Sequence, residues 1–215
     1  MKFPQQAFDT QQNAGLGQLA VRRLVMNNPP DSPYFPTADD YGCLGWTLDP
    51  EDILTAAQTL TTGVGMASLL VIPNTVTVNR LSAAFATVQG TQTNFNGVAL
   101  YSVNAALTTL TQVAVSATQT WTGVSTTAIT DAPFSTTPQI TPGYYWATIL
   151  GSTSGTAATI HGANAISSGA LNFSKNSGVT QWRSFTFGSG LTAFPATITL
   201  ASVTKSAFTP FLALS

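Results

Sequence analysis

Two side chains of this 215-residue sequence could supply nucleophilic chemistry: the single cysteine, Cys43, and the single histidine, His161. A thiol becomes an effective nucleophile when an imidazole within hydrogen-bond reach accepts its proton. Nothing near either residue supports such a pair, because His161 lies in Thr-Ile-His-Gly, a pattern typical of the end of a strand. We therefore expect His161 to form structural hydrogen bonds with the backbone, and we predict no catalytic residue.

Paired carboxylates would indicate glycoside hydrolysis, which requires two acids roughly 5 to 9.5 Å apart. After residue 52 the sequence holds one acid, Asp131. A hydrolase site in this part of the chain would lack its second carboxylate. The sequence therefore predicts that the protein is not an enzyme.

Acidic residues gather instead near the end of the N-terminal region, at Asp39, Asp40, Asp49, Glu51 and Asp52. Such oxygens could bind calcium, but their spacing fits no EF-hand loop. The run Asp-Pro-Glu-Asp at 49–52 is typical of a helix start, with a capping aspartate, a proline in the first turn and acids near the positive end of the helix dipole. Contact with a basic neighbouring subunit is the other alternative. We favour capping over a metal, and we expect no metal and no cofactor.

The elements that must position these groups are strands. Only 7% of the residues are charged, against about 25% in a typical soluble protein, while 44% are hydrophobic. Threonine and valine are abundant, and both prefer pleated, half-buried surfaces. Strand-like segments recur every ten to fifteen residues between Gly, Ser, Asn and Pro, at 66–72, 75–86, 97–103, 107–115, 128–134, 143–150, 156–161, 182–187, 196–200 and 208–214. This spacing predicts an all-β fold, an antiparallel sandwich or barrel.

In the segment at 75–86 the alternation of inward and outward residues changes parity part-way along. Val76 and Val78 are expected to point inward, and so are Leu81, Ala83 and Phe85, although the second group has the opposite parity. A bulge or bend near residue 80 would reconcile the two groups.

Residues 1–52 differ from residues 53–215. Apolar residues at helical spacing predict a short helix at 15–26, and five prolines between 29 and 50 then favour an extended course. Residues 1–52 hold seven acids and three bases, a net charge of −4, whereas the remainder holds one acid and four bases, a net charge of +3. We interpret residues 1–52 as an extended assembly arm and 53–215 as the β-sandwich domain. The arm is expected to contact neighbouring subunits through Arg22, Arg23, Tyr34, Phe35, Tyr41 and Trp46.

Several short motifs occur in a recognisable order after residue 44. They are Gly-Trp-Thr-Leu-Asp-Pro at 45–50, Leu-Leu-Val-Ile-Pro at 69–73, Gly-Val-Ala-Leu-Tyr at 97–101, Thr-Pro-Gly-Tyr-Tyr-Trp-Ala at 141–147 and Phe-Pro-Ala-Thr at 194–197. In this order the chain resembles the minor tail and related virion proteins of long-tailed phages that infect actinobacteria, over roughly residues 45–215. The resemblance implies a jelly-roll-like β-sandwich with a structural or adhesive role and no catalytic residues. Residues 1–44 match no part of the family pattern.

The aromatic residues allow two interpretations. Flat rings beside amide side chains are typical of carbohydrate sites. Most aromatic residues of a sandwich are core, however, and consecutive residues such as 144–146 must alternate between the faces of a strand. Core packing or subunit contact is therefore favoured over sugar binding. The candidates for glycan or subunit contact are Tyr101, Trp121, Tyr145 and Trp182, from a larger group that includes Tyr144, Trp146 and Phe185.

The expected function is that of a phage virion structural protein, a minor tail or baseplate component that assembles through its N-terminal arm. The alternatives are a capsid decoration or head-fibre protein, and a carbohydrate-binding module for a host receptor. The expected partners are other virion proteins and copies of the same chain, a trimer being one candidate homo-oligomer, with host surface glycan under the receptor alternative. Basic density is too low for nucleic-acid binding. No apolar run reaches 18 residues and no secretory signal opens the chain, so we expect no membrane span, synthesis in the host cytoplasm and a final location in the virion.

Overall fold

A computed structural model describes residues 42–48, 56–124, 129–164 and 183–215. The helix predicted at 15–26, the acidic residues between 39 and 52, and Trp182 lie outside the described residues. The chain divides into two compact units, Met1–Cys43 and Leu44–Ser215. The division falls between Cys43 and Leu44 rather than after residue 52.

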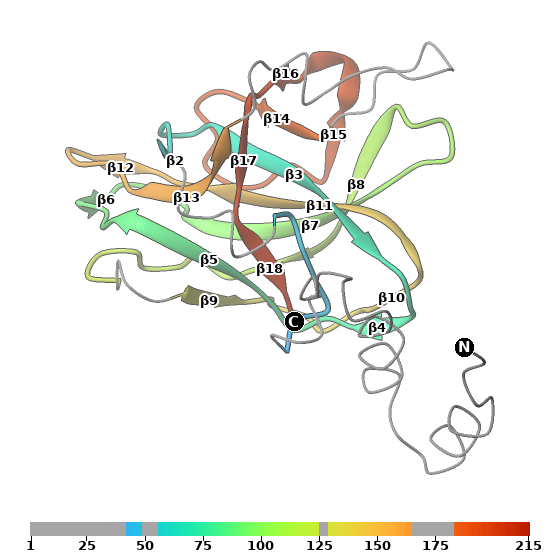
Figure 1. Cartoon of the computed structure of the whole chain (residues 1–215). Coiled ribbons are helices and arrows are strands. Elements are labelled where there is room, and N and C mark those ends of the chain that lie inside the picture. The colour runs from blue at the N-terminus through green and yellow to red at the C-terminus, as the bar shows by residue number, and fades with distance from the viewer. Residues whose placement is uncertain (1–41, 49–55, 125–128, 165–182) are drawn as a thin grey trace, which may run out of the picture. The chain divides into compact units, whose positions relative to one another are not determined.

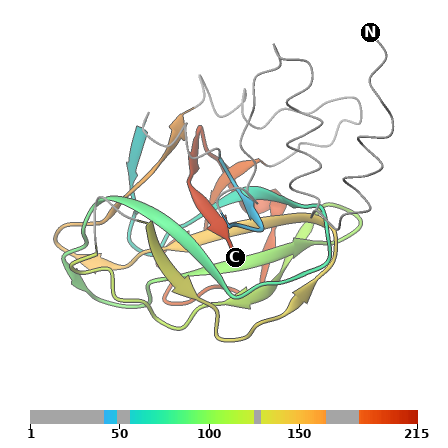
Figure 2. The same cartoon turned by 60° about the horizontal axis from the view of Figure 1, so that its bottom comes forward.

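The described residues of the unit Leu44–Ser215 form an all-β structure, as predicted, and its sheets are antiparallel. The first seven-stranded sheet, sheet I, has three long, hydrogen-bonded neighbouring strands at its centre; Figures 1 and 2 show the unit in two views. Its order is β15 (Thr197–Thr199), β8 (Thr109–Val115), β7 (Gly97–Val103), β11 (Gly143–Leu150), β3 (Gly65–Ile72), β14 (Ser184–Phe187) and β16 (Thr204–Lys205).

The second seven-stranded sheet, sheet II, is more irregular. Its order is β1 (Gly45–Trp46), β18 (Leu212–Leu214), β5 (Arg80–Thr87), β13 (Thr159–Asn164) and β17 (Phe208–Pro210), with β2 (Ala56–Thr59) paired to β13 and β9 (Ile129–Pro133) paired to β5. A bridge between Ser116 and Phe134 links the end of β8 to the end of β9. The two sheets are thereby joined along one side, and the sandwich has the form of a curled half-barrel.

Two small ladders close the ends of β11. At its start β4 (Val76–Thr77) pairs with β10 (Gln139–Ile140), and after its end β6 (Thr91–Gln92) pairs with β12 (Thr153–Ser154). The alternation defect expected near residue 80 is present as a break between β4 and β5. Val78 lies in this break and is buried, and Leu81 begins a new run of inward residues.

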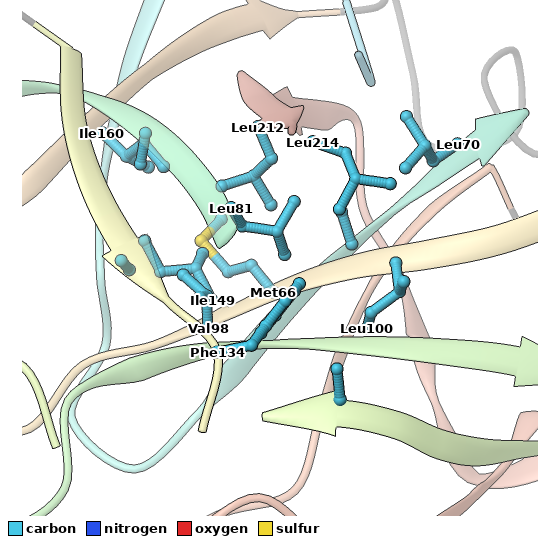
Figure 3. Close-up of a cluster of buried hydrophobic side chains, with 14 of the residues drawn as sticks. Met66, Leu70, Leu81, Val98, Leu100, Phe134, Ile149, Ile160, Leu212 and Leu214 are labelled. Carbon is cyan, nitrogen blue, oxygen red and sulfur yellow. The ribbon is translucent and has the colours of Figure 1, made fainter. Parts of the chain in front are cut away.

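The main core lies between the sheets (Figure 3). Sheet I contributes Met66, Leu70, Val98, Leu100 and Ile149, and sheet II contributes Leu81, Ile160, Leu212 and Leu214. Burying one such side chain stabilises the fold by about 1.5–3 kcal/mol. This core explains why the alternating segments of the sequence form strands: each places every second residue here.

A second core covers the opposite face of sheet I. Its strand residues include Tyr101, Trp146, Phe185 and Leu150, and residues 191–203, which include β15 and the short 3₁₀ turn η3 (Leu200–Ser202), pack over them. Phe194 connects the aromatic side chains of this core. Its ring centroid lies 5.6 Å from that of Phe95 and 6.5 Å from that of Tyr101. Sheet I is therefore buried on both faces along much of its length, which explains the nearly continuous apolar sequence of β7 and β11.

Polar side chains fix the loops beside β6 and β12. The Asn96 amide oxygen accepts hydrogen bonds from the Ser152 backbone N–H at 2.7 Å and from Gln89 Nε2 at 3.3 Å, while Gln89 Nε2 also donates to the Ser152 carbonyl at 2.6 Å. All three residues are buried. Buried polar groups must be paired to avoid a desolvation cost, so this cluster joins three separate loops.

Candidate interaction surface

The structure corrects the expectation that Tyr101, Trp121 and Tyr145 are surface contacts. All three are buried, with 0%, 1% and 6% of their surface exposed. A sugar or a second subunit cannot stack on a ring that the chain itself covers. Trp182, the fourth candidate, lies outside the described residues.

Each of the three rings is held by a particular contact. The Tyr101 hydroxyl donates a hydrogen bond to the Pro195 carbonyl at 2.7 Å, and burial raises the pKa of Tyr101 well above its ordinary value. The Trp121 ring packs on Phe85 at 5.2 Å between centroids. The Tyr145 hydroxyl donates to the Thr141 carbonyl at 2.9 Å. These residues stabilise the sandwich and do not form a binding face.

Trp46 also has a role that differs from the expected arm contact. It is half-buried in β1, where it pairs with Ala213 of β18. The adjacent Thr47 hydroxyl donates to the Pro210 carbonyl at 2.6 Å and accepts from the Leu212 N–H at 2.9 Å. Residues 44–47 are thus hydrogen-bonded to the C-terminal strands of sheet II. The other predicted arm contacts, Arg22, Arg23, Tyr34, Phe35 and Tyr41, lie outside the described residues.

The residues considered for chemistry occupy structural positions. His161 lies in β13, opposite Ala57, and is half-buried; its carbonyl accepts a hydrogen bond from the Phe211 N–H at 2.9 Å. Asp131 forms an ion pair with Arg80 at 3.1 Å and accepts a hydrogen bond from the Ser82 hydroxyl at 2.6 Å. Among the residues that the structure describes, no group of three or more His, Cys, Asp or Glu side chains could hold a metal ion.

The most exposed large apolar side chains lie on sheet I. Tyr144 is 59% exposed and Val71 is 55% exposed, and the two are direct cross-strand partners on β11 and β3. Alternation places Tyr144 on the same face as Trp146, that is, on the face that the second core covers farther along the sheet. The pair is therefore the uncovered continuation of an apolar face.

Three further residues border this pair. Ser102 is the cross-strand partner of Tyr145, so the next residue of β7, Val103, lies beside Tyr144. Leu69 lies on the same face of the sheet, two residues before Val71 on β3. Val103 and Leu69 are half-buried. The Leu69 N–H donates to the carbonyl of Arg183 at 2.8 Å, which places the exposed Arg183 beside Leu69. We call Leu69, Val71, Val103, Tyr144 and Arg183 the Tyr144 surface.

Charge distinguishes this part of the molecule. The described residues contain one acid and three bases, and Arg80 pairs with the acid Asp131. The other two bases, Arg183 and Lys205, are both exposed at the β14–β16 side of sheet I, where Lys205 is the cross-strand partner of Phe185. The Tyr144 surface therefore combines an exposed aromatic ring, aliphatic groups and the guanidinium group of Arg183, which suits an acidic partner that carries apolar groups.

Sequence reasoning included Tyr144 among the aromatic candidates but did not single it out, and it gave Val71 no role. The alternation of 144–146 does show that one face takes Tyr144 and Trp146 and the other takes Tyr145. Which of these side chains meets solvent depends on which distant segments pack over each face, and no local pattern encodes that.

No protein-family model matches the chain, and a search of the curated proteins found none with significant similarity. Within the described ranges, no helix is long and apolar enough to cross a membrane.

Proposed function

We propose that this protein is a structural component of a bacteriophage virion, in the tail or baseplate, and that it works by binding other subunits. The observation that carries the proposal is the Tyr144 surface, where the exposed Tyr144 and Val71 are direct cross-strand partners and Arg183 lies beside them. Exposed apolar groups on a rigid sheet are characteristic of protein contacts, in which tyrosine and arginine are enriched. The sequence resemblance to minor tail and virion proteins supplies the class of assembly.

The order of the strands supports a jelly-roll-like connectivity. The chain passes from β3 in sheet I to β5 in sheet II and back to β7, and after the β7–β8 hairpin it passes to β9, β11, β13 and β14 in alternating sheets. Repeated crossing between two antiparallel sheets is a feature of jelly rolls, which are common in capsid proteins. We infer from this that the domain is a jelly roll with an added hairpin.

The location of the protein on particles tests the proposal. Virions of the phage that encodes the chain would be purified through two density gradients, and the protein would be measured by quantitative mass spectrometry and located with gold-labelled antibody. We expect a fixed copy number per particle with label on the tail or baseplate. Label on the head would support the capsid decoration alternative, and absence from intact particles would refute a virion role.

Binding to a host glycan is the weaker second candidate. The three described rings proposed for stacking are buried, and Tyr144 is the exposed ring that remains among the described candidates. Retention on host cell walls that is lost in Tyr144→Ala, with an unchanged melting temperature, would favour this candidate.

A further inference from the structure

We propose that the Tyr144 surface binds residues 29–41 of a second copy of this chain, so that the copies are linked by their N-terminal regions. The inference rests on the proposed assembly function and names the partner of its contact surface. It commits to one occupant, a peptide segment of known sequence.

The chemistry of this segment matches the surface. Residues 29–41 read Pro-Pro-Asp-Ser-Pro-Tyr-Phe-Pro-Thr-Ala-Asp-Asp-Tyr, with four prolines, three aromatic residues, three aspartates and no base. The rings can pack on Val71 and Tyr144, and the aspartates carry the charge that complements Arg183. Proline-rich segments bind aromatic surfaces at a low entropic cost because prolines restrict the free peptide to extended conformations.

The charge of the whole chain favours the same pairing. Between residues 29 and 52 there are six acids and no base, whereas Arg183 is an exposed base that borders the Tyr144 surface. If the Tyr144 surface instead contacted the same surface of another copy, Arg183 would approach a surface that also carries a positive charge. An acidic segment is therefore the better complement.

The way the chain enters the domain favours a second copy over the same copy. Leu44 packs against the core between the sheets, and a Cβ atom at Gly45 would lie 3.1 Å from the Leu70 side chain and 3.3 Å from that of Ile72. These contacts lie on the inner face of sheet I, whereas the Tyr144 surface is on its outer face. Docking of the segment on its own copy would not depend on protein concentration, so the dilution series below separates the two cases.

The test uses the full-length protein. Sedimentation velocity over a hundredfold dilution series would measure self-association, and fluorescence anisotropy would measure binding of a labelled peptide with the sequence of residues 29–41. We expect Val71→Ser with Tyr144→Ser to weaken both by at least tenfold. Ile129→Ser, which removes an exposed apolar group on β9 (54% exposed), is the matched control and should change neither.

A charge exchange tests the polar half of the contact. Arg183→Glu should weaken association severalfold, and a mixture of this variant with copies that carry Asp39→Lys and Asp40→Lys should recover it. The wild-type interaction should weaken between about 50 mM and 0.5 M salt, because the screening length for exposed charges falls from roughly 14 Å to roughly 4 Å over that range. Circular dichroism melting of each variant verifies that the domain is folded.

The outcomes separate this inference from the proposed function. A monomer at every concentration, or association unaffected by the Val71 and Tyr144 variants, overturns the inference. If such variants still enter virions at normal copy number, the virion role stands and the docking site is wrong. If the wild type self-associates through this surface but is absent from virions, the proposed function is wrong and the contact is real.

Discussion

The substitution Tyr101→Phe tests whether residues 191–203 are fastened to sheet I as the structure describes. Tyr101 is fully buried, and its hydroxyl donates to the Pro195 carbonyl at 2.7 Å. Phenylalanine keeps the ring packing against Phe194 and Phe187 but removes this bond. Losing one buried neutral hydrogen bond costs about 0.5–1.5 kcal/mol, so we expect a loss of about 1 kcal/mol in the free energy of unfolding at pH 8.

The dependence on pH makes the prediction more specific. Burial raises the pKa of Tyr101 in the folded state, whereas in the unfolded chain a tyrosine ionises near pH 10. Above that pH the unfolded state binds fewer protons than the folded state, so stability falls as pH rises. The phenol therefore favours folding fully below about pH 10, and this contribution decreases by about 1.4 kcal/mol per pH unit above it. Tyr101→Phe has no such dependence.

Urea unfolding monitored by tryptophan fluorescence at several pH values between 8 and 11.5 measures the difference. Wild type should be more stable by about 1 kcal/mol up to about pH 9. The two curves should cross between about pH 10 and 11, where the loss from ionisation of the unfolded chain reaches about 1 kcal/mol. Tyr144→Phe, at an exposed ring, is the control for loss of a hydroxyl at pH 8 and should change stability by less than about 0.5 kcal/mol. A difference between wild type and Tyr101→Phe that stays constant across the whole range would refute the burial of this phenol.

Three further substitutions test other parts of the domain. Asn96→Ala should lower the free energy of unfolding by about 2–4 kcal/mol in urea titrations, because the Ser152 N–H and Gln89 Nε2 lose a buried acceptor. The control is Gln92→Ala, which removes an exposed hydrogen bond and should cost less than about 0.5 kcal/mol. Gly162→Ala should cost at least about 2 kcal/mol, because the new Cβ would lie 2.1 Å from the Thr209 carbonyl oxygen, and a melting temperature equal to wild type would contradict this packing. Asp131→Asn should change stability by no more than about 1 kcal/mol, since the ion pair with Arg80 is half-exposed, and a larger loss in thermal melts at low salt would show that the pair matters more than its exposure implies.

Much of the fold could be predicted because its signals are local. The strand expected at 143–150 is β11, and those expected at 97–103 and 66–72 correspond to β7 and β3. Each owes its position to alternation of inward and outward residues between turn residues, which a single chain segment carries by itself. The break near residue 80 was predictable for the same reason, because a change of parity within one strand cannot place both halves in the core without a bend.

The boundary at Leu44 could not be predicted in this way. Residues 44–48 look like part of a proline-rich arm, but Leu44 donates to the Leu214 carbonyl at 2.7 Å and Gly45 pairs with that residue. A two-residue strand has no period to detect. Its partner lies at the far end of the sequence, so only the folded chain brings the two together.

The sequence by itself determined that this protein is all-β, that few ionisable groups follow residue 52, and that its aromatic residues must divide between the two faces of their strands. The tertiary structure decided which of those faces meets solvent. Tyr101 and Trp146 are buried in the second core, whereas Tyr144 and Val71 on the same face of sheet I are exposed, so rings with the same parity have opposite exposure. Burial depends on which distant segment lies on top of a residue, and alternation along one strand carries no information about that.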